Sequence, residues 1–573
     1  MPVHNNDIAA VFNQVADLLE IKGENQFRIR AYRNAARTVD GLSQSAADMI
    51  AQGKDLSELS GIGKDLAGKI NKVVETGTVK LLEDLKGETP AELSDLMHVS
   101  GLGAKRVATL HKELNVTTLD ELAQAAKDGR IAELEGFGAK TQESILEEIE
   151  RLRQEKQQRT KLAVAEQYAE PLVDYLKQAK GIKEIVIAGS YRRRKETVRD
   201  LDILVTCKKG SKVMDRFVNY DEVQKVVSHG RTKSTVLLRS GLQVDLRVVP
   251  QVSYGSALMY STGSKQHNIA VRKIAVKKKL KLSEYGIFEE DERVAGRTEQ
   301  EVYKQVGLPF VEPELREDRG EVEAARKGKL PKLIEEKDIR GDLHVHTKRT
   351  DGHHTISELV EAARKRSYDY IAISDHSQHV TVAGGLKPEA VREQIEEIDR
   401  LNNHLKGFTV LRAIEVDILE DGSLDLPDDV LGTLDLTICS VHSKFGLSRG
   451  RQTDRILKAM DNRHFTVLGH PTGRLINERE PYEVDLGKVM RAAKDKGLFL
   501  EVNAHPDRLD LNDIYCKMAV GMGVKVAIST DTHRIDDLNY MRFGVGQARR
   551  GWLRADDVIN TRSVTELKKL LKK

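Results

Sequence analysis

The sequence of 573 residues is 32% charged and 39% hydrophobic, with a net charge of +3. These values are typical of a globular protein, and a chain too long for one hydrophobic core predicts about three to five domains. Charges interrupt every apolar run, and residues 1–20 lack the apolar centre of a signal peptide, so we expect a cytoplasmic protein without membrane spans. Cys207, Cys439 and Cys516 form no CxxC pair, so we expect no disulfide framework.

The first half of the chain changes character near residue 160. Residues 1 to about 150 show helical periodicity that three Gly-x-Gly turns interrupt. Runs of β-branched residues around 182–206 and 234–249 predict strands, and residues 252–317 show a mixed pattern. We therefore expect all-α domains followed by an α+β domain.

The second half of the chain follows a stretch that is typical of a linker. From Pro309 to Asp338, three prolines stand among dense charge. From residue 339 onward, short apolar runs alternate with helical patterns, as in the βα units of a parallel barrel or an open α/β sheet. Twelve of the seventeen histidines lie from His344 onward, which indicates metal chemistry in this part.

Three short segments of the N-terminal part place a hydrophobic residue before Gly-x-Gly and a predicted helix directly after it. The glycines permit a tight turn with positive φ, and amides at the helix start then point at a phosphate oxygen. Such a contact positions a protein on DNA without reading its sequence. The segments are 59–70, 99–110 and 134–145. We expect DNA binding by the first two, whereas the third is as consistent with a structural corner; the binding residues are Gly61, Gly63, Gly101, Gly103 and Lys105.

A pattern of strand, basic loop and strand predicts a site for divalent metal ions. One strand leads into Gly189-Ser190, and the second carries Asp200 and Asp202. Strand alternation puts these two carboxylates on one face, roughly 7 Å apart along the chain, and two like charges favour a cation between them. A third strand supplies Asp245. Three carboxylates around two Mg²⁺ ions can activate a 3′-hydroxyl and stabilise a leaving pyrophosphate.

These features resemble the family X DNA polymerases of the nucleotidyltransferase superfamily. The segment YSTGSKQHNIAVR strengthens the resemblance, because it is similar to the family's motif after the palm. The resemblance implies Mg²⁺ or Mn²⁺ as the cofactor and Asp245 as the general base. Lys265 and Arg199 replace an Asp and a Gly of the vertebrate repair enzyme, and the added charge predicts stronger triphosphate binding. The implied nucleotide site is Gly189, Ser190, Arg193, Tyr260, Thr262, Gly263, Lys265, Asn268 and Arg272.

The first glycine hairpin resembles the helix-hairpin-helix of the polymerase β-like lyase domain. By that resemblance Lys69 stands at the Schiff-base lysine, which opens an abasic sugar by β-elimination. Such an amine must be deprotonated, and neighbouring positive charge commonly lowers its pKa. Here Asp65 replaces another lysine of the family's pocket and would raise the pKa of Lys69. A surface lysine on a DNA-facing helix is therefore an equally good interpretation.

Ligand-type residues follow the apolar runs of the C-terminal part. In DLHVHT, both histidines project to one side of a strand, as two ligands of one metal would. Each further candidate stands where an apolar run ends, the place where α/β barrels gather catalytic groups. The nine candidates suffice for three metal ions, with the glutamate as a bridging ligand, and Mn²⁺, Zn²⁺ and Fe²⁺ all suit them. They are His344, His346, Asp351, His376, Glu415, His442, His470, Asp531 and His533. We expect six other histidines not to be ligands: His353, His354, His379, His404, His464 and His505.

This arrangement resembles the polymerase and histidinol phosphatase (PHP) domain, a distorted seven-stranded barrel with a trinuclear site. The resemblance to bacterial and archaeal family X polymerases fused to a PHP domain covers nearly the whole chain. It implies gap filling in base excision repair, joined to Mn²⁺-dependent 3′-5′ exonuclease, 3′-phosphatase or abasic-site endonuclease action. The implied partners are deoxynucleoside triphosphates and gapped or nicked DNA with a 5′-phosphate, bound by a monomer at the nucleoid.

The expected fold is multidomain, with N-terminal all-α helix-hairpin-helix domains, an α+β nucleotidyltransferase palm and a C-terminal distorted (β/α)7 barrel. Two alternatives are a non-polymerising nucleotidyltransferase with a phosphatase tail and a non-enzymatic DNA scaffold. The glycine hairpins and YSTGSKQHN argue against the first, and the complete sets of carboxylates and histidines argue against the second. The expected domains are a helical lyase-like domain (1–85), helix-hairpin-helix fingers (86–160), palm (161–251), thumb (252–317), linker (318–338) and PHP domain (339–573).

Overall fold

The computed structural model describes residues 5–40, 46–59, 61–97, 99, 101–155 and 159–572. Backbone contacts divide the chain into two compact units, Met1–Arg159 and Thr160–Lys573. The described part of each unit has a buried hydrophobic core of its own. None of the described helices is both long enough and apolar enough to cross a membrane.

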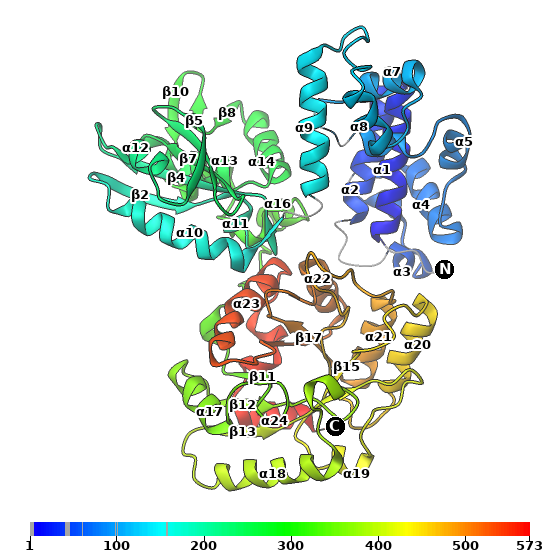
Figure 1. Cartoon of the computed structure of the whole chain (residues 1–573), viewed down its shortest axis with the longest axis vertical. Coiled ribbons are helices and arrows are strands. Elements are labelled where there is room, and N and C mark those ends of the chain that lie inside the picture. Colours follow the sequence, from blue (N-terminus) through cyan, green and yellow to red (C-terminus); the bar gives the residue numbers. More distant parts are fainter. Residues whose placement is uncertain are drawn as a thin grey trace. The chain divides into compact units, whose positions relative to one another are not determined.

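The described residues of the first unit form helices (Figure 1, blue to cyan). Helix α1 (Asn5–Ile21) packs along α2 (Gln26–Asp40), because each has an apolar face. The rings of Phe12 and Tyr32 meet edge to face there, with centroids 5.5 Å apart. The other helices are α3 (Ala46–Ala51), η1 (Leu56–Glu58), α4 (Lys64–Thr76), α5 (Lys80–Glu88), α6 (Leu93–Leu96), α7 (Ala104–Leu114), α8 (Leu119–Lys127) and α9 (Ala139–Glu155).

The second unit begins with a mixed five-stranded sheet in the order β2-β4-β7-β6-β5, which we call the palm sheet. At its centre β4 (Asp200–Cys207) runs parallel to β7 (Gln243–Val248), and the other pairs are antiparallel. Leu201 and Ile203 of β4 point into a core that also includes helix α10 (Leu162–Lys177). The runs of β-branched residues thus form strands, as predicted. The remaining elements are β1 (Thr160–Lys161), β2 (Ile182–Ile187), α11 (Gly189–Arg192), β3 (Thr197–Val198), α12 (Val213–Val218), β5 (Val223–His229) and β6 (Lys233–Leu238).

The next part of this unit combines helices with a three-stranded antiparallel sheet in the order β10-β9-β8. Helices α13 (Tyr254–Thr262) and α14 (Lys265–Lys277) follow one another directly. They share a core in which Val271, Ile287 and Tyr303 are buried. The other elements are η2 (Gln251–Ser253), β8 (Leu280–Ser283), β9 (Gly286–Glu289), β10 (Glu292–Ala295), α15 (Glu299–Val306) and η3 (Pro313–Leu315).

The segment 318–338, expected to be a linker, packs closely against the rest of the second unit. It contains α16 (Glu321–Arg326) and η4 (Glu336–Asp338). Glu321 is fully buried, and its carboxylate accepts a hydrogen bond 2.6 Å long from the His267 ring. Glu321 therefore takes part in a buried pair, which the composition of the segment alone does not reveal.

Residues 339–572 form a barrel of parallel strands. Its two sheets, β11-β12-β13 and β14-β15-β16-β17-β18, contain only parallel pairs. Strands β13 (Thr409–Arg412) and β14 (Glu415–Asp417) follow so closely that they occupy one position. A parallel bridge from Val345 to Thr532 joins the first strand position to the last. The barrel thus has seven strand positions, as predicted. The other strands are β11 (Gly341–Val345), β12 (Tyr370–Ile373), β15 (Ile438–Ser440), β16 (Val467–Leu468), β17 (Phe499–Asn503) and β18 (Val526–Ser529).

Helices surround these strands (Figure 1, yellow-green to red). Their apolar faces and the strands share one large core, in which Ile371, Val410 and Leu500 are fully buried or nearly so. Since each helix returns the chain to the start of the next strand, the carboxyl ends of the strands collect at one end of the barrel. The helices are α17 (Ile356–Lys365), α18 (Pro388–Asn402), α19 (Asp428–Leu431), α20 (Arg449–Ala459), α21 (Leu486–Lys496), α22 (Asp513–Met522), α23 (Met541–Arg550) and α24 (Val564–Leu571).

Candidate active sites

Three carboxylates meet on neighbouring strands of the palm sheet. Asp200 and Asp202 lie on β4, and the register of the parallel pair sets Asp202 directly opposite Asp245 on β7. Gly189, at the start of α11, approaches them so closely that an added Cβ would lie 2.4 Å from Oδ2 of Asp202. Its φ of +61° also favours glycine. The Gly-Ser pattern is thus explained by the close approach of backbone to carboxylate.

The palm carboxylates repel one another at short range. Burial, followed by the charges of Asp200 and Asp245, raises the pKa of Asp202 to about 6. The negative charge of Asp245 is partly balanced, because Nζ of Lys233 lies 2.9 Å from its Oδ2 and the Thr235 hydroxyl donates to its Oδ1 at 2.6 Å. A divalent cation stabilises such a cluster of half-buried carboxylates, so these residues fit Mg²⁺ or Mn²⁺.

Several candidate nucleotide ligands come from two turns that contact each other. Arg193, directly after α11, donates from Nη1 to the carbonyl of Thr262 at 2.5 Å. A Cβ on Gly263 would lie 3.2 Å from the same Nη1. Arg192 donates to the Thr262 hydroxyl at 2.7 Å, while Ser190 lies within α11. The structure therefore brings the basic loop against the turn that follows α13.

The remaining nucleotide candidates lie on α13 and α14. Asn268 donates from Nδ2 to the carbonyl of Tyr260 at 2.8 Å. Both side chains line a small pocket together with Arg272. Lys265 begins α14 and is exposed, as is Arg272. These side chains thus form one accessible face of the two helices.

The nine candidate ligands of the barrel converge at the carboxyl ends of its strands. Their ligand atoms form three groups, each within 4.8 Å: His346, Asp351, His376 and His533; His344, His346 and Asp531; and His376, Glu415 and His442. The ninth candidate, His470, places its Nε2 3.0 Å from Oε1 of Glu415. One continuous cluster therefore contains every residue that the strand-end pattern selects.

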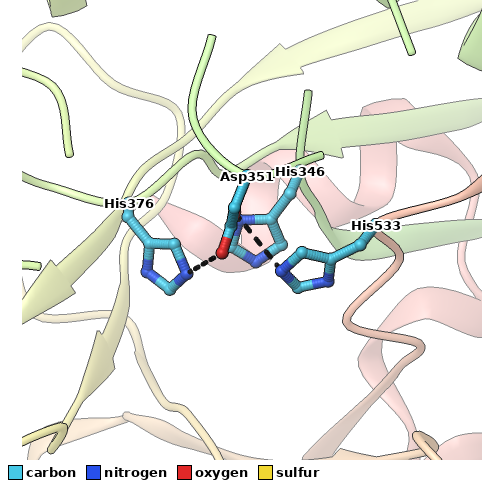
Figure 2. Close-up of side chains that lie close together, drawn as sticks. All are labelled: His346, Asp351, His376 and His533. Carbon is cyan, nitrogen blue, oxygen red and sulfur yellow. Dashed lines mark ion pairs between the residues drawn. The ribbon is translucent and has the colours of Figure 1, made fainter. Parts of the chain in front are cut away.

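Asp351 lies at the centre of the first of these groups. Figure 2 shows its carboxylate between the rings of His376 and His533, each of which places Nε2 3.4 Å from one of its oxygens. Nδ1 of His346 lies 3.7 Å away. Burial opposes ionisation here, yet His376 and His533 hold the pKa of Asp351 well below its usual value. The carboxylate is therefore ionised, as a metal ligand must be.

Some buried ring nitrogens of the cluster make no hydrogen bond within the described part of the chain. They include both nitrogens of His346 and Nδ1 of His470. Burial, followed by the charges of His533 and His376, lowers the pKa of His346 to about 3, so this imidazole is neutral and offers a lone pair. Buried polar atoms normally have partners, and neutral imidazoles are metal ligands. The donor set therefore fits divalent transition metals.

Comparison with known families accounts for nearly the whole chain. The matches are the helix-hairpin-helix domain (3–79), the SAM-like helix-hairpin-helix tandem (53–115 and 93–151), the DNA polymerase beta palm (159–275), the DNA polymerase beta thumb (257–317) and the PHP domain (342–505). The DNA polymerase/3′-5′ exonuclease PolX of Bacillus subtilis is 37% identical over 575 residues, covering 100% of both chains. The chain belongs to the family X DNA polymerases with a C-terminal PHP domain. The predicted family, fold class and enzyme class are thereby confirmed.

Other relatives match the PHP part of this family X polymerase alone. Probable phosphatases of Thermoanaerobacter sp. and Caldanaerobacter subterraneus are 31% and 30% identical over 249 and 211 residues. These matches cover 40% and 34% of this chain, and 94% and 75% of the relatives. Asp531 and His533 lie beyond the residues matched by the PHP family, and the geometry of the cluster joins them to it.

Two carboxylates behind the ligands of this polymerase were not predicted. Glu501 accepts hydrogen bonds from Nδ1 of His344 at 2.8 Å and from the amide of His470 at 2.7 Å. Asp417 lies 3.1 Å from Nδ1 of His442. Such contacts orient a ligand imidazole and fix its tautomer. The sequence gives little indication of either carboxylate, because each stands within a run of mostly apolar residues.

The glycine hairpins of the polymerase have the predicted backbone. Gly61 and Gly101 have φ of +81° and +85°, where glycine is favoured. Gly63 and Gly103 are the N-caps of α4 and α7, and neither cap has a side-chain hydrogen bond. Amides of each first turn are thus available to an outside acceptor. Lys105 is exposed beside the second hairpin, whereas Ser60, His98 and Ser100 lie outside the described residues.

The third hairpin and the candidate lyase lysine have partners within the first unit. Arg106 donates to the carbonyls of Gly101 in the second hairpin and Gly136 in the third, at 2.9 and 3.2 Å. The third hairpin therefore packs against the second and stabilises it. Nζ of Lys69 lies 2.5 Å from Oδ2 of Asp65. Burial works to lower the pKa of Lys69, but hydrogen bonds to Asp65 and Tyr32 raise it above its ordinary value. The amine is therefore held in its charged form.

Proposed function

We propose that the palm site of this polymerase fills short gaps bearing a 5′-phosphate during base excision repair. Asp200, Asp202 and Asp245 hold divalent cations, Mg²⁺ or Mn²⁺, which when bound supply Lewis acidity for the attacking and leaving oxygens. Asp245 also accepts the proton of the primer 3′-hydroxyl. The strand register that sets Asp202 opposite Asp245 carries this proposal.

The incoming deoxynucleoside triphosphate binds beside these carboxylates. Ser190 and Arg193 contact its phosphates, Gly189 lets the loop that carries them approach Asp202, and exposed Lys265 adds positive charge. The contact of Arg193 with the carbonyl of Thr262 supports this role, because it holds the guanidinium at the turn before α14. Further roles are proposed for the sugar pocket (Tyr260, Thr262 and Gly263), the base contact (Asn268) and the template side (Arg272).

The barrel site removes nucleotides or blocking groups from 3′ ends, as an exonuclease with 3′-phosphatase and abasic-site endonuclease action. Its nine ligands hold three divalent ions, chosen from Mn²⁺, Zn²⁺ and Fe²⁺, which when bound supply Lewis acidity for phosphoester hydrolysis. Glu415 would be the carboxylate shared between ions, and Nε2 atoms of both His442 and His470 lie within 3.2 Å of its Oε1, which supports this role. The continuous cluster of ligand atoms supports this assignment.

The first two glycine hairpins place the enzyme on gapped or nicked DNA through the phosphate backbone. Residues 1–85 and 86–160 bind DNA, 161–317 extend the primer, and 339–573 trim its 3′ end. The enzyme acts as a monomer on the nucleoid in the cytoplasm. We do not assign β-elimination to Lys69, because its raised pKa disfavours the neutral amine that the reaction needs.

One gapped, 5′-phosphorylated DNA with a free primer 3′-hydroxyl tests the proposal, using Mg²⁺ or Mn²⁺. We expect Asp245→Ala to lose primer extension but keep 3′-end degradation, and His344→Ala to show the reverse. Extension by Asp245→Ala would contradict the palm assignment. Degradation by His344→Ala at the wild-type rate would contradict the barrel assignment.

A further inference from the structure

Arginines of the PHP domain contact the basic loop of the palm, which we define as residues 189–196. Arg550, at the end of α23, has a side chain only 2% exposed. Its Nη1 donates to the backbone carbonyl of Arg193 at 2.8 Å and to Oε1 of Glu317 at 2.9 Å. Its Nη2 donates to Oδ2 of Asp513 at 2.6 Å. One PHP side chain therefore reaches the main chain of a proposed triphosphate ligand.

Oε1 of Glu317, which accepts from Arg550, also accepts a hydrogen bond from the side chain of Arg193. Nε of Arg193 donates to Oε1 of Glu317 at 3.0 Å, while its Nη1 is bound to the Thr262 carbonyl. Although burial opposes ionisation, Arg550 and Arg193 hold the pKa of Glu317 below its ordinary value. Arg550 thus fixes Arg193 twice, directly at its carbonyl and through Glu317 at its guanidinium.

Two further PHP arginines contact the basic loop after Arg193, one directly and one through a glutamate of α10. Arg474 binds Glu196 with both Nη atoms, at 3.2 and 2.7 Å. Arg542 donates to Oε2 of Glu166 at 2.9 Å, and the other oxygen of this glutamate accepts from Arg194 at 2.7 Å. The PHP arginines therefore contact the loop directly at Arg193 and Glu196, and at Arg194 through Glu166.

These contacts indicate that Arg550 positions the basic loop and does not merely join the PHP domain to the palm. An exposed ion pair contributes little, because water and salt screen it. Arg550 is buried against two carboxylates, so its loss would leave Glu317 and Asp513 without their shared cation and free the loop carbonyl. Arg193 would keep its own contacts with Glu317 and Thr262, but of these PHP arginines only Arg474 and, through Glu166, Arg542 would still hold the loop.

We infer that Arg550 of the PHP domain is a positioning residue for nucleotide binding at the palm, acting through Glu317 and the carbonyl of Arg193. The inference rests on the proposed contact of Arg193 with the triphosphate. By this account the PHP domain is part of the framework of the polymerase site, in addition to carrying its own metal cluster.

Steady-state extension of gapped DNA by the full chain tests this inference. Since small displacements of a positioning group are costly, we expect Arg550→Ala to raise the KM for the triphosphate about tenfold, with a smaller change in kcat. Arg549→Ala is the matched control, because Arg549 lies on the same helix but binds Glu314 and the Ile334 carbonyl, at 2.7 and 2.9 Å. Exonuclease activity on single-stranded DNA, measured in parallel, reports on folding.

A double-mutant cycle separates positioning from general weakening. We expect Arg193→Ala combined with Arg550→Ala to have the KM of Arg193→Ala alone, since the second change acts through the first. Additive effects, or equal KM values for Arg550→Ala and Arg549→Ala, would overturn the inference. If Arg193→Ala leaves KM unchanged, the proposed triphosphate contact itself fails. Should Arg550→Ala lose exonuclease activity as well, Glu317→Gln takes its place, and an unchanged KM there would overturn the inference.

Discussion

Asp202 lies next to two other carboxylates, so protons and metal ions compete for it. Its folded-state pKa of about 6 means that it is ionised above this pH and becomes neutral below it. We therefore expect the Mg²⁺ concentration for half-maximal primer extension to rise by about tenfold per pH unit below pH 6, and to be nearly constant above it. Extension measured over Mg²⁺ titrations at pH 5 to 8 checks this. An equal Mg²⁺ requirement at pH 5 and pH 7 would contradict it.

Glu501 contacts two candidate ligands of the barrel, His344 and His470, so its removal should weaken metal binding without removing a ligand. We expect Glu501→Gln to raise the Mn²⁺ concentration for half-maximal exonuclease activity by about tenfold to a hundredfold, because such supporting contacts tune ligand imidazoles. Glu396→Gln is the control, since Glu396 is exposed on α18 and pairs with Arg400. The same Mn²⁺ requirement in both variants would refute the role of Glu501.

Single residues also mark the limit of prediction from sequence. Strand alternation predicted that Asp200 and Asp202 lie on one face of a strand, but nothing in the sequence gives the register that sets Asp202 opposite Asp245. Ligand histidines could be found because polar residues after apolar runs are conspicuous. Glu501 could not, because FLEVN is also a normal pattern for a strand at the edge of a core.

Among helices, strands and turns, the sequence predicted best those elements whose conformation depends on residues close together in the chain. The glycine hairpins, the strand of DLDILV and the strands of the barrel all depend on short-range periodicity and turn residues. The segment 318–338 was less predictable, because prolines and charge indicate a linker only while the charges face water. Here Glu321 is buried against His267, a contact between residues 54 positions apart.

The second hairpin is an element whose backbone can be tested directly. Gly101 has φ of +85°, and an added Cβ would meet nothing within 4 Å, so Gly101→Ala strains the turn without a clash. We expect this change to weaken binding to gapped DNA by about threefold to tenfold, through roughly 1 kcal/mol of backbone strain. Gly87→Ala in α5, which also has open space but no positive φ, is the control. Equal DNA affinities of the two variants, measured by fluorescence anisotropy, would argue against phosphate binding by the hairpin.

At the scale of the whole molecule, the palm and the barrel belong to one compact unit. Contacts such as that of Arg474 with Glu196 join residues 278 positions apart, which no local pattern predicts. The sequence could therefore predict which residues gather at each candidate site, but not the contacts that join the two domains. Two sites on one chain suit a task in two steps, because a blocked 3′ end cannot attack a triphosphate until it is trimmed.

We propose that the palm and barrel sites act in sequence on one primer. A gapped, 5′-phosphorylated DNA whose primer ends in a 3′-phosphate tests this order of events, with extension followed in Mn²⁺. We expect wild type to extend this primer, Asp245→Ala to remove the phosphate without extension, and His344→Ala to do neither while still extending a 3′-hydroxyl primer. A mixture of the two variants should restore extension. Extension of the blocked primer by His344→Ala alone would contradict the account.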